Sequence, residues 1–323
     1  MRGKAAAERM FPLSIDIKEL DYENYGKCVS VSNGIIEAVV TIDVGPRIVR
    51  FGFCGEKNLF YNDLERKGVV YDKDFDELYG EGSKFYNYGG HRLWLSPESY
   101  PATYYPDNEP VVYGILRDGV SFTPAKQRHN DMQLSFELMM SENATDIMVV
   151  HSAKNCSKDE QTLALWAVTM MNPGGLEIIP QNQGGSDLLP NRTLVLWPYT
   201  DLHDKRVNWG KKFITLRHDP AVEDGKRFKM GIDNLLGWAA YVNDGYVMIK
   251  RYVHNLRAAY PDFGASYETY LTKEFLEMET LSPLYHIEPG ETVRHVENLS
   301  LFRAHMQPNP DDEEQLEKFI SEL

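Results

Sequence analysis

CVSVSNGIIEAVVTI, residues 28–42, is the stretch that decides the fold. Two runs rich in Val and Ile flank Asn33-Gly34, and Asn-Gly supplies the positive φ angles that a type I′ hairpin turn requires. Asp-Gly recurs in the same setting at Asp118-Gly119 and at Asp244-Gly245, each time between runs of β-branched and aromatic residues. Because hairpins join antiparallel neighbours, the sequence predicts an all-β fold of antiparallel sheets.

The remainder of the chain extends this prediction to a single large domain. Aromatic residues make up 12% of the sequence, and short strand-like runs continue to residue 302 with no long linker or charge block between them. We therefore expect an N-terminal arm over residues 1–20 and one domain over residues 21–306.

The C-terminal segment, residues 307–323, has a different pattern. Asn309 can cap a helix, Pro310 suits the first helical position, and apolar residues recur at helical spacing at Leu316, Phe319, Ile320 and Leu323. The pattern predicts a short amphipathic helix, packed on its own chain or on a partner.

Charge and hydropathy narrow the class of protein. The sequence has 34 Lys and Arg against 48 Asp and Glu, a net charge of −14, which disfavours nucleic acid and anionic membranes as partners. The longest mainly apolar run, residues 163–171, is far shorter than the roughly 20 residues of a membrane-spanning helix. With no signal-peptide pattern and three cysteines outside any CxxC motif, we expect a cytoplasmic protein with reduced thiols.

Common cofactor and metal motifs are missing from the sequence. It contains no P-loop, no dinucleotide-binding glycine motif and no nucleophile elbow, and its nine histidines form no HxH or HExxH pattern. We therefore expect no cofactor, and the spacing predicts no metal site, although residues distant in sequence could still assemble one.

The densest group of chemically useful residues is FYNYGGHRLWLSPE, residues 85–98. Its glycine pair permits unusual backbone angles, His91 can carry a proton, Arg92 and Glu98 can bind hydroxyl groups, and Trp94 offers a flat stacking face. Aromatic rings pack on the apolar faces of sugars, so the segment is typical of a carbohydrate site. The alternative is that Trp94 and its neighbouring tyrosines belong to the core and that Gly89-Gly90 is only a turn.

A second candidate segment lies near the C-terminus, at residues 275–291. Strand alternation places Phe275, Glu277 and Glu279 on one face. If that face lines a concave apolar site, desolvation would raise a carboxyl pKa from roughly 4.3 toward the 6 to 7 that suits a general base. The alternative is a solvated outer face with ordinary surface carboxylates.

These segments belong to a wider resemblance. The chain resembles the galactose mutarotase-like superfamily, and most closely the branch that carries a GGHRLW motif, here at residues 89–94. Further matching pieces include Gly45-Pro-Arg-Ile48, Leu165-Trp-Ala-Val-Thr169 and Glu279-Thr-Leu-Ser-Pro283, and the similarity extends from about residue 21 to 303. It implies a β-supersandwich of antiparallel sheets with a sugar cleft on its concave face.

The resemblance also implies roles for particular residues. Glu279 looks like the glutamate with which aldose 1-epimerases take the anomeric hydroxyl proton, and His91 and Arg92 resemble their proton-donating histidine and substrate-binding arginine. The chain departs from the epimerases at Trp166-Ala-Val-Thr-Met170, where they carry a catalytic histidine. His151, one strand earlier, could replace it only if the sheet turns that side chain inward.

We therefore expect a cofactor-independent aldose mutarotase or epimerase that binds a small sugar or sugar derivative, as a monomer or a homodimer. Glu279 is the expected base and His91 the expected acid. The expected substrate-binding residues are Arg47, Arg92, Trp94, Glu98, Lys229 and Tyr270, while Trp238 is assigned to the core. Two alternatives stay open: a sugar-binding module without catalysis, and a lyase or hydrolase that pairs Glu98 or Glu109 with Glu279.

Overall fold

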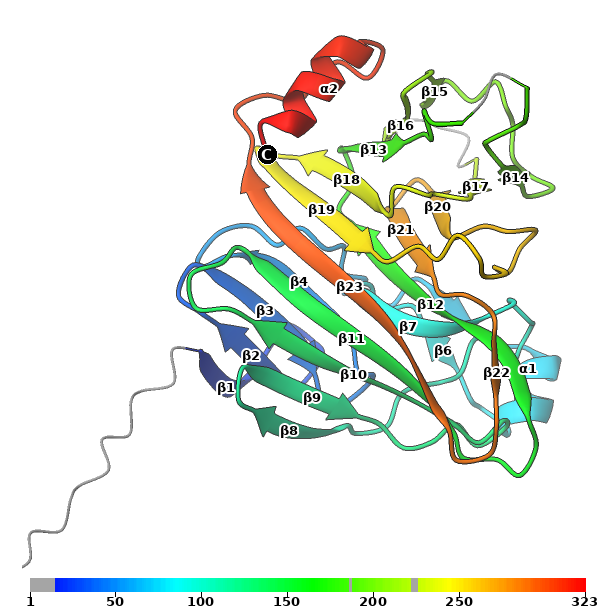
Figure 1. Cartoon of the computed structure of the whole chain (residues 1–323). Helices are drawn as coiled ribbons and strands as arrows, with labels where there is room; N and C mark the ends of the chain where they lie inside the picture. The colour runs from blue at the N-terminus through cyan, green and yellow to red at the C-terminus, as the bar shows by residue number, and fades with distance from the viewer. Residues whose placement is uncertain (1–14, 186–187, 222–225) are drawn as a thin grey trace, which may run out of the picture.

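Two large antiparallel sheets, packed face to face, make up most of the computed structural model (Figure 1), which describes residues 15–185, 188–221 and 226–323. The first strand begins at Asp16, inside the segment expected as an N-terminal arm over residues 1–20. Residues 1–14 of that arm lie outside the described residues. The all-β prediction is confirmed.

The first sheet carries the candidate site. Its strands, in spatial order, are β1 (Asp16–Asp21), β2 (Lys27–Ser32), β3 (Ile36–Thr41), β4 (Ile48–Phe53), β7 (His91–Ser96), β12 (Gln161–Met171), β21 (Leu276–Leu281), β20 (Tyr267–Leu271), β17 (Phe228–Ile232) and β14 (Leu194–Leu196), with β22 (Tyr285–Ile287) paired to β12.

The second sheet covers one face of the first. Its strands, in spatial order, are β15 (Val207–Trp209), β16 (Phe213–Arg217), β13 (Leu176–Pro180), β18 (Trp238–Asn243), β19 (Tyr246–Tyr252), β23 (Thr292–Arg303), β11 (Asp146–Asn155), β10 (Met132–Met140), β9 (Gly119–Thr123) and β8 (Val112–Leu116). A small pair, β5 (Val69–Val70) and β6 (Phe85–Tyr86), and the helix α1 (Lys73–Tyr79) lie in the long connection between β4 and β7.

The main core lies between the two sheets. Phe51 and Met278 from the first sheet and Phe136 and Leu299 from the second belong to one buried apolar cluster. The face of the first sheet that points into this core is its inner face, and the opposite one is its outer face. A separate small cluster of Trp166, Val168 and Leu281, with Trp94 against it, lies on the outer face.

The Asn-Gly and Asp-Gly signals mark hairpins, although only one has the expected turn. Asp244 and Gly245 both have positive φ angles, 50° and 83°, as a type I′ turn requires. At the first hairpin only Gly34 does, at 84°, because Asn33 instead accepts hydrogen bonds through Oδ1 from the backbone N–H groups of Ile35 and Ile36.

The C-terminal helix is present as α2 (Glu313–Ser321) and packs on its own chain. Its cap is Asp312, which accepts a hydrogen bond from the Gln315 N–H, so Asn309 lies three residues before the cap. Leu316 is buried with Phe213 and Val247 of the second sheet, and Trp238 packs against the same cluster. Trp238, which was assigned to the core, is only partly buried there.

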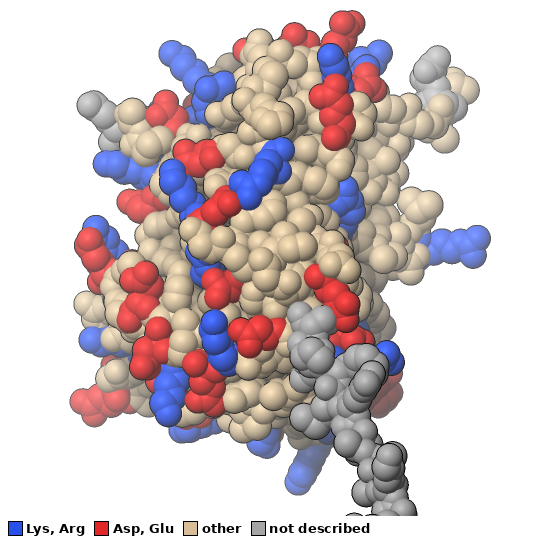
Figure 2. Space-filling model, turned by 90° about the vertical axis from the view of Figure 1, so that its left-hand side faces the viewer, with Lys and Arg blue, Asp and Glu red and all other residues tan. Residues whose placement is uncertain are grey.

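Two surface properties bear on the function. Neither helix in the described part of the chain has the length and apolarity that crossing a bilayer demands. On the face shown in Figure 2, basic and acidic side chains are interleaved rather than separated into blocks of one sign.

Candidate functional site

Strand register gathers the candidate side chains on the outer face of the first sheet. Residues directly opposite one another on paired strands share a face. Trp94 of β7 is opposite Trp166 of β12, and Tyr270 of β20 is opposite both Glu277 of β21 and Lys229 of β17. Aromatic, acidic and basic side chains from five strands therefore project from the outer face.

These side chains line a cavity of about 540 Å³, within the range of roughly 300 to 1,000 Å³ that is usual for small-molecule sites. Below it is called the outer cavity. Five of the expected substrate-binding residues line it. Its walls are formed by Lys67, Gly68, Val69, Val70, Phe85, Asn87, Arg92, Trp94, Glu98, Tyr104, Trp166, Trp197, Tyr199, Arg227, Lys229, Tyr270, Phe275 and Glu277.

Glu277 is the buried one of the two carboxylates, with Glu98, that line the outer cavity. It is 8% exposed, and one of its oxygens lies 3.8 Å from Nη2 of Arg92. Burial and the nearby charge of Glu279 raise the pKa of Glu277 to about 7, against the opposing effect of Arg92. The alternative of a solvated carboxylate face is thereby excluded, because Glu277 and Glu279 are both buried.

Glu279 lies beneath the wall of the outer cavity, in a charged cluster. Its Oε2 accepts hydrogen bonds from Trp166 Nε1 at 2.7 Å and Lys229 Nζ at 3.0 Å, and Lys229 also lies 2.9 Å from Glu268. Burial lowers the pKa of the Lys229 ammonium, but the neighbouring carboxylates of Glu279 and Glu268 raise it, and its net value lies well above the usual one. Burial also raises the pKa of Glu268 well above its usual value, against the opposing effect of Lys229.

Aromatic rings form much of the wall of the outer cavity. The Arg92 guanidinium lies 3.8 Å from the centre of the Trp94 ring, and the Trp94 and Trp166 ring centres are 5.2 Å apart. Lys229 lies over the rings of Trp166 and Trp197, at 4.6 and 4.7 Å. These contacts fix the two cations on aromatic faces.

Glu98 and Tyr270 are the other two expected residues that line the outer cavity. Glu98 accepts a hydrogen bond from the Tyr104 hydroxyl at 2.5 Å, and Tyr270 lies across from Glu277. Burial raises the pKa of Tyr270 to about 12, so its phenol keeps its proton at neutral pH.

His91 does not share a cavity with Glu279. Adjacent residues on a strand point to opposite faces, so Arg92 lies on the outer face and His91 on the inner face. His91 is fully buried, with Nδ1 2.8 Å from Thr169 Oγ1 and Nε2 3.0 Å from His151 Nε2. His151 does point inward, as it must in order to replace the missing histidine, but it points into the space between the two sheets and not toward the outer cavity.

Arg47 also lies away from the outer cavity. Its side chain is fully buried, both Asp107 carboxylate oxygens accept hydrogen bonds from its Nη2 at 3.0 Å, and its guanidinium lies over the Tyr88 ring at 5.0 Å. It holds Asp107 against the first sheet and does not line the outer cavity.

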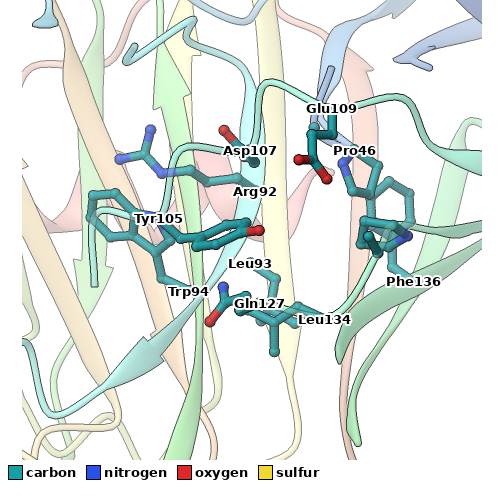
Figure 3. Close-up of a pocket in the computed structure, with 13 residues that line it drawn as sticks. Pro46, Arg92, Leu93, Trp94, Tyr105, Asp107, Glu109, Gln127, Leu134 and Phe136 are labelled. Carbon is teal, nitrogen blue, oxygen red and sulfur yellow. The ribbon is translucent and has the colours of Figure 1, made fainter. Parts of the chain in front are cut away.

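A second hollow lies beside Arg92 and Trp94. Figure 3 shows these two side chains on one side, Pro46 and Phe136 on the other, and the Tyr105 ring between them. Its volume is about 50 Å³, well below the usual range for a ligand site. Of these two, the outer cavity is therefore the candidate ligand site.

Several residues that line the outer cavity were not among the predicted site residues. Glu277 shares a face with Glu279, and this alternation was the available signal for it. Trp166 entered the sequence analysis only as part of the segment in which aldose 1-epimerases carry a histidine. Trp197, Tyr199 and Arg227 lie outside strands and carry no local pattern that points to a site.

Chemically, the outer cavity combines stacking faces, cations and one carboxyl group that can gain and lose a proton near neutral pH. This combination suits proton transfer at a hydroxyl group of a ring-shaped polar ligand. Among the described residues, no histidine lines it.

Comparison with known proteins identifies the fold. No protein-family model and no curated protein matches the sequence. A solved galactose mutarotase-like protein from Lactobacillus casei is 10% identical, with a TM-score of 0.54 over 85% of this chain and 100% of its own. A Klebsiella pneumoniae protein provisionally assigned as an aldose 1-epimerase is 10% identical, with a TM-score of 0.58 over 95% of this chain and 86% of its own.

A third solved structure is larger. A TPR-domain containing protein from Parabacteroides distasonis is 14% identical, with a TM-score of 0.56 over 85% of this chain, which spans 47% of that protein. At these identities the similarity establishes the fold alone.

Proposed function

We propose that this chain, which has the galactose mutarotase-like fold, binds a small sugar in the outer cavity and interconverts its anomers by acid–base catalysis. The observation that carries the proposal is Glu277, a carboxyl group at the cavity wall whose pKa is raised to about 7. A general base works best when its pKa lies near the operating pH.

In the proposed reaction, the Glu277 carboxylate takes the proton from the anomeric hydroxyl. The bond between C1 and the ring oxygen breaks, and the ring oxygen takes up a proton as the ring opens. Rotation about the bond to C1 and reversal of these steps gives the other anomer. The hydroxyls of Tyr104, Tyr199 and Tyr270 are the neutral tyrosine donors at the cavity wall.

Glu279 receives a different role from the one that the resemblance implies. Its Oε2 is held by Lys229 and Trp166, and its charge contributes to the raised pKa of Glu277. We assign Glu279 as a positioning residue that tunes Glu277. We assign no proton transfer to His91, which lies on the inner face.

The experiment that tests the proposal is anomer exchange followed by NMR on a panel of free aldoses, uronic acids and sugar phosphates. Wild type should accelerate exchange of at least one sugar, and Glu277→Gln should lose about 10² to 10⁴ of that acceleration. Glu279→Gln should retain activity but shift its pH dependence downward. Loss of exchange in Glu279→Gln together with full activity in Glu277→Gln would reverse the two roles.

Glu177→Gln is the matched control. Glu177 is also buried, and desolvation raises its pKa to about 8, but its oxygens accept hydrogen bonds from Tyr267 and Thr269 on the inner face. The same chemical change at this position should leave exchange unaltered.

One observation favours a second candidate, a sugar-binding module without catalysis. Among the described residues the outer cavity contains no histidine, whereas its aromatic walls suit binding alone. Ligand-induced line broadening without accelerated exchange across the panel would support this alternative.

A further inference from the structure

A second polar cluster lies between the two sheets, on the opposite side of the first sheet from the outer cavity. His91 comes from β7 of the first sheet, and His151 and Glu297 come from β11 and β23 of the second. All three are fully buried. They are separated in sequence by 60 and 146 residues, so no local spacing could reveal them.

Three donor atoms of this cluster lie close together, all within 4.8 Å of one another. His91 Nε2 lies 3.0 Å from His151 Nε2 and 3.5 Å from Glu297 Oε2, and His151 Nε2 lies 3.1 Å from the same oxygen. Imidazole and carboxylate ligands about 2.0 to 2.1 Å from a tetrahedral zinc ion lie about 3.3 Å from one another. The three separations bracket that value, so one ion could contact all three atoms with little movement.

From this geometry we propose that His91, His151 and Glu297 form a buried site for zinc or a similar divalent transition metal. Two imidazoles and one carboxylate are a ligand set that zinc uses, and the fourth position would hold a small ligand such as water. Because the ligands come from both sheets, the ion would cross-link the sandwich. The inference does not rest on the proposed function of the outer cavity.

The surrounding groups hold these ligands in place. Thr169 Oγ1 lies 2.8 Å from His91 Nδ1, which leaves Nε2 of that ring for the ion. The other oxygen of Glu297, Oε1, is taken by Lys250 Nζ at 3.0 Å and by the Thr280 hydroxyl, which leaves Oε2 facing the imidazoles. Partners of this kind orient ligands in metal sites.

The competing interpretation is a purely hydrogen-bonded cluster, in which one proton lies between the two imidazoles and Lys250 balances the charge of Glu297. Both interpretations account for the short contacts, and they differ in whether the folded chain retains an ion. Because the cluster is fully buried, metal added to folded protein could exchange slowly, so the test uses refolding.

The full chain is unfolded in guanidinium with EDTA, freed of chelator, and refolded with zinc chloride, cobalt chloride or no metal. After desalting, the zinc sample should retain about one ion per chain by mass spectrometry, and the cobalt sample should show the strong visible bands of a four-coordinate ion. Refolded wild type that retains no metal, or cobalt with only the weak bands of a six-coordinate ion, would overturn the proposal.

Variants locate the ion. His91→Gln and Glu297→Gln should lose it, whereas the matched control His295→Gln should keep it, because His295 is buried beside the cluster but directs Nε2 to Thr280 at 2.8 Å. Folded ligand variants that still bind one ion would also overturn the proposal. If those variants fail to fold, the cobalt spectrum of wild type decides whether the proposed site exists.

Discussion

Replacing Lys229 with methionine should destabilise the protein strongly, because it leaves Glu279 as an unpaired buried charge. The ammonium lies 3.0 Å from Glu279 and 2.9 Å from Glu268, and both carboxyl groups are almost completely buried. Burial raises the pKa of Glu268 well above its usual value, which favours its neutral form, so the ion pair that this change breaks is the one between Lys229 and Glu279.

Breaking a buried ion pair by removing one partner typically costs about 3 to 5 kcal/mol. We expect a loss of that size in the free energy of unfolding at pH 7, measured by urea denaturation followed by circular dichroism. The double variant Lys229→Met with Glu279→Gln should recover most of the loss, because it removes the orphaned charge as well.

The matched control is Lys57→Met. Lys57 forms an exposed ion pair with Asp244 at 2.8 Å, and its removal should leave stability unchanged within error. A Lys229→Met variant as stable as wild type, or a double variant no more stable than the single one, would refute the reasoning about the buried pair.

Three further predictions concern the folding energetics and the outer cavity. The pKa of Glu177 is raised to about 8 in the folded chain, so as pH rises the unfolded chain loses this proton first. Wild type therefore loses stability between roughly pH 4.5 and 8. Glu177→Gln lacks this loss and should gain stability relative to wild type between pH 5.5 and 8 in urea titrations. Leu316→Ala should cost about 2 to 5 kcal/mol of unfolding free energy, because Leu316 is the fully buried side chain by which α2 packs on the second sheet; thermal melts in which the variant matches wild type would contradict this packing. Trp94→Ala should weaken sugar binding about tenfold by NMR titration, whereas Trp238→Ala, outside the outer cavity, should leave affinity unchanged.

Much of the fold could be predicted from local patterns. Asp244-Gly245 marks a type I′ hairpin, and the apolar spacing from Leu316 to Leu323 marks a helix, whose packing on its own chain only the structure decides. The turn at Asn33 differs because a side-chain hydrogen bond competes with the backbone geometry that Asn-Gly usually adopts. Local sequence signals the turn but not which hydrogen bonds close it.

The candidate site was predicted in part, and strand alternation explains both outcomes. Alternation placed Glu277 with Glu279 on one face, and the structure buries both on the outer face. The structure places residues 91–96 in a strand, where the same rule puts His91 and Arg92 on opposite faces, so only Arg92 shares the outer face with Glu279.

Residues contributed by loops could not be predicted. Trp197 and Arg227 reach the outer cavity through contacts between segments far apart in sequence, such as the cation of Lys229 over the Trp197 ring. The cluster of His91, His151 and Glu297 depends in the same way on how the two sheets are packed.

The most direct test of the central claim is the pH dependence of anomer exchange in wild type and in Glu277→Gln. If Glu277 is the base, its carboxylate fraction follows a pKa of about 7, and the wild-type rate should rise roughly tenfold between pH 6 and pH 8. The variant should show a low rate with no such rise. A wild-type rate that is flat or falls over this range, or a variant that keeps the wild-type profile, would contradict the assignment of Glu277 as the group that transfers the proton.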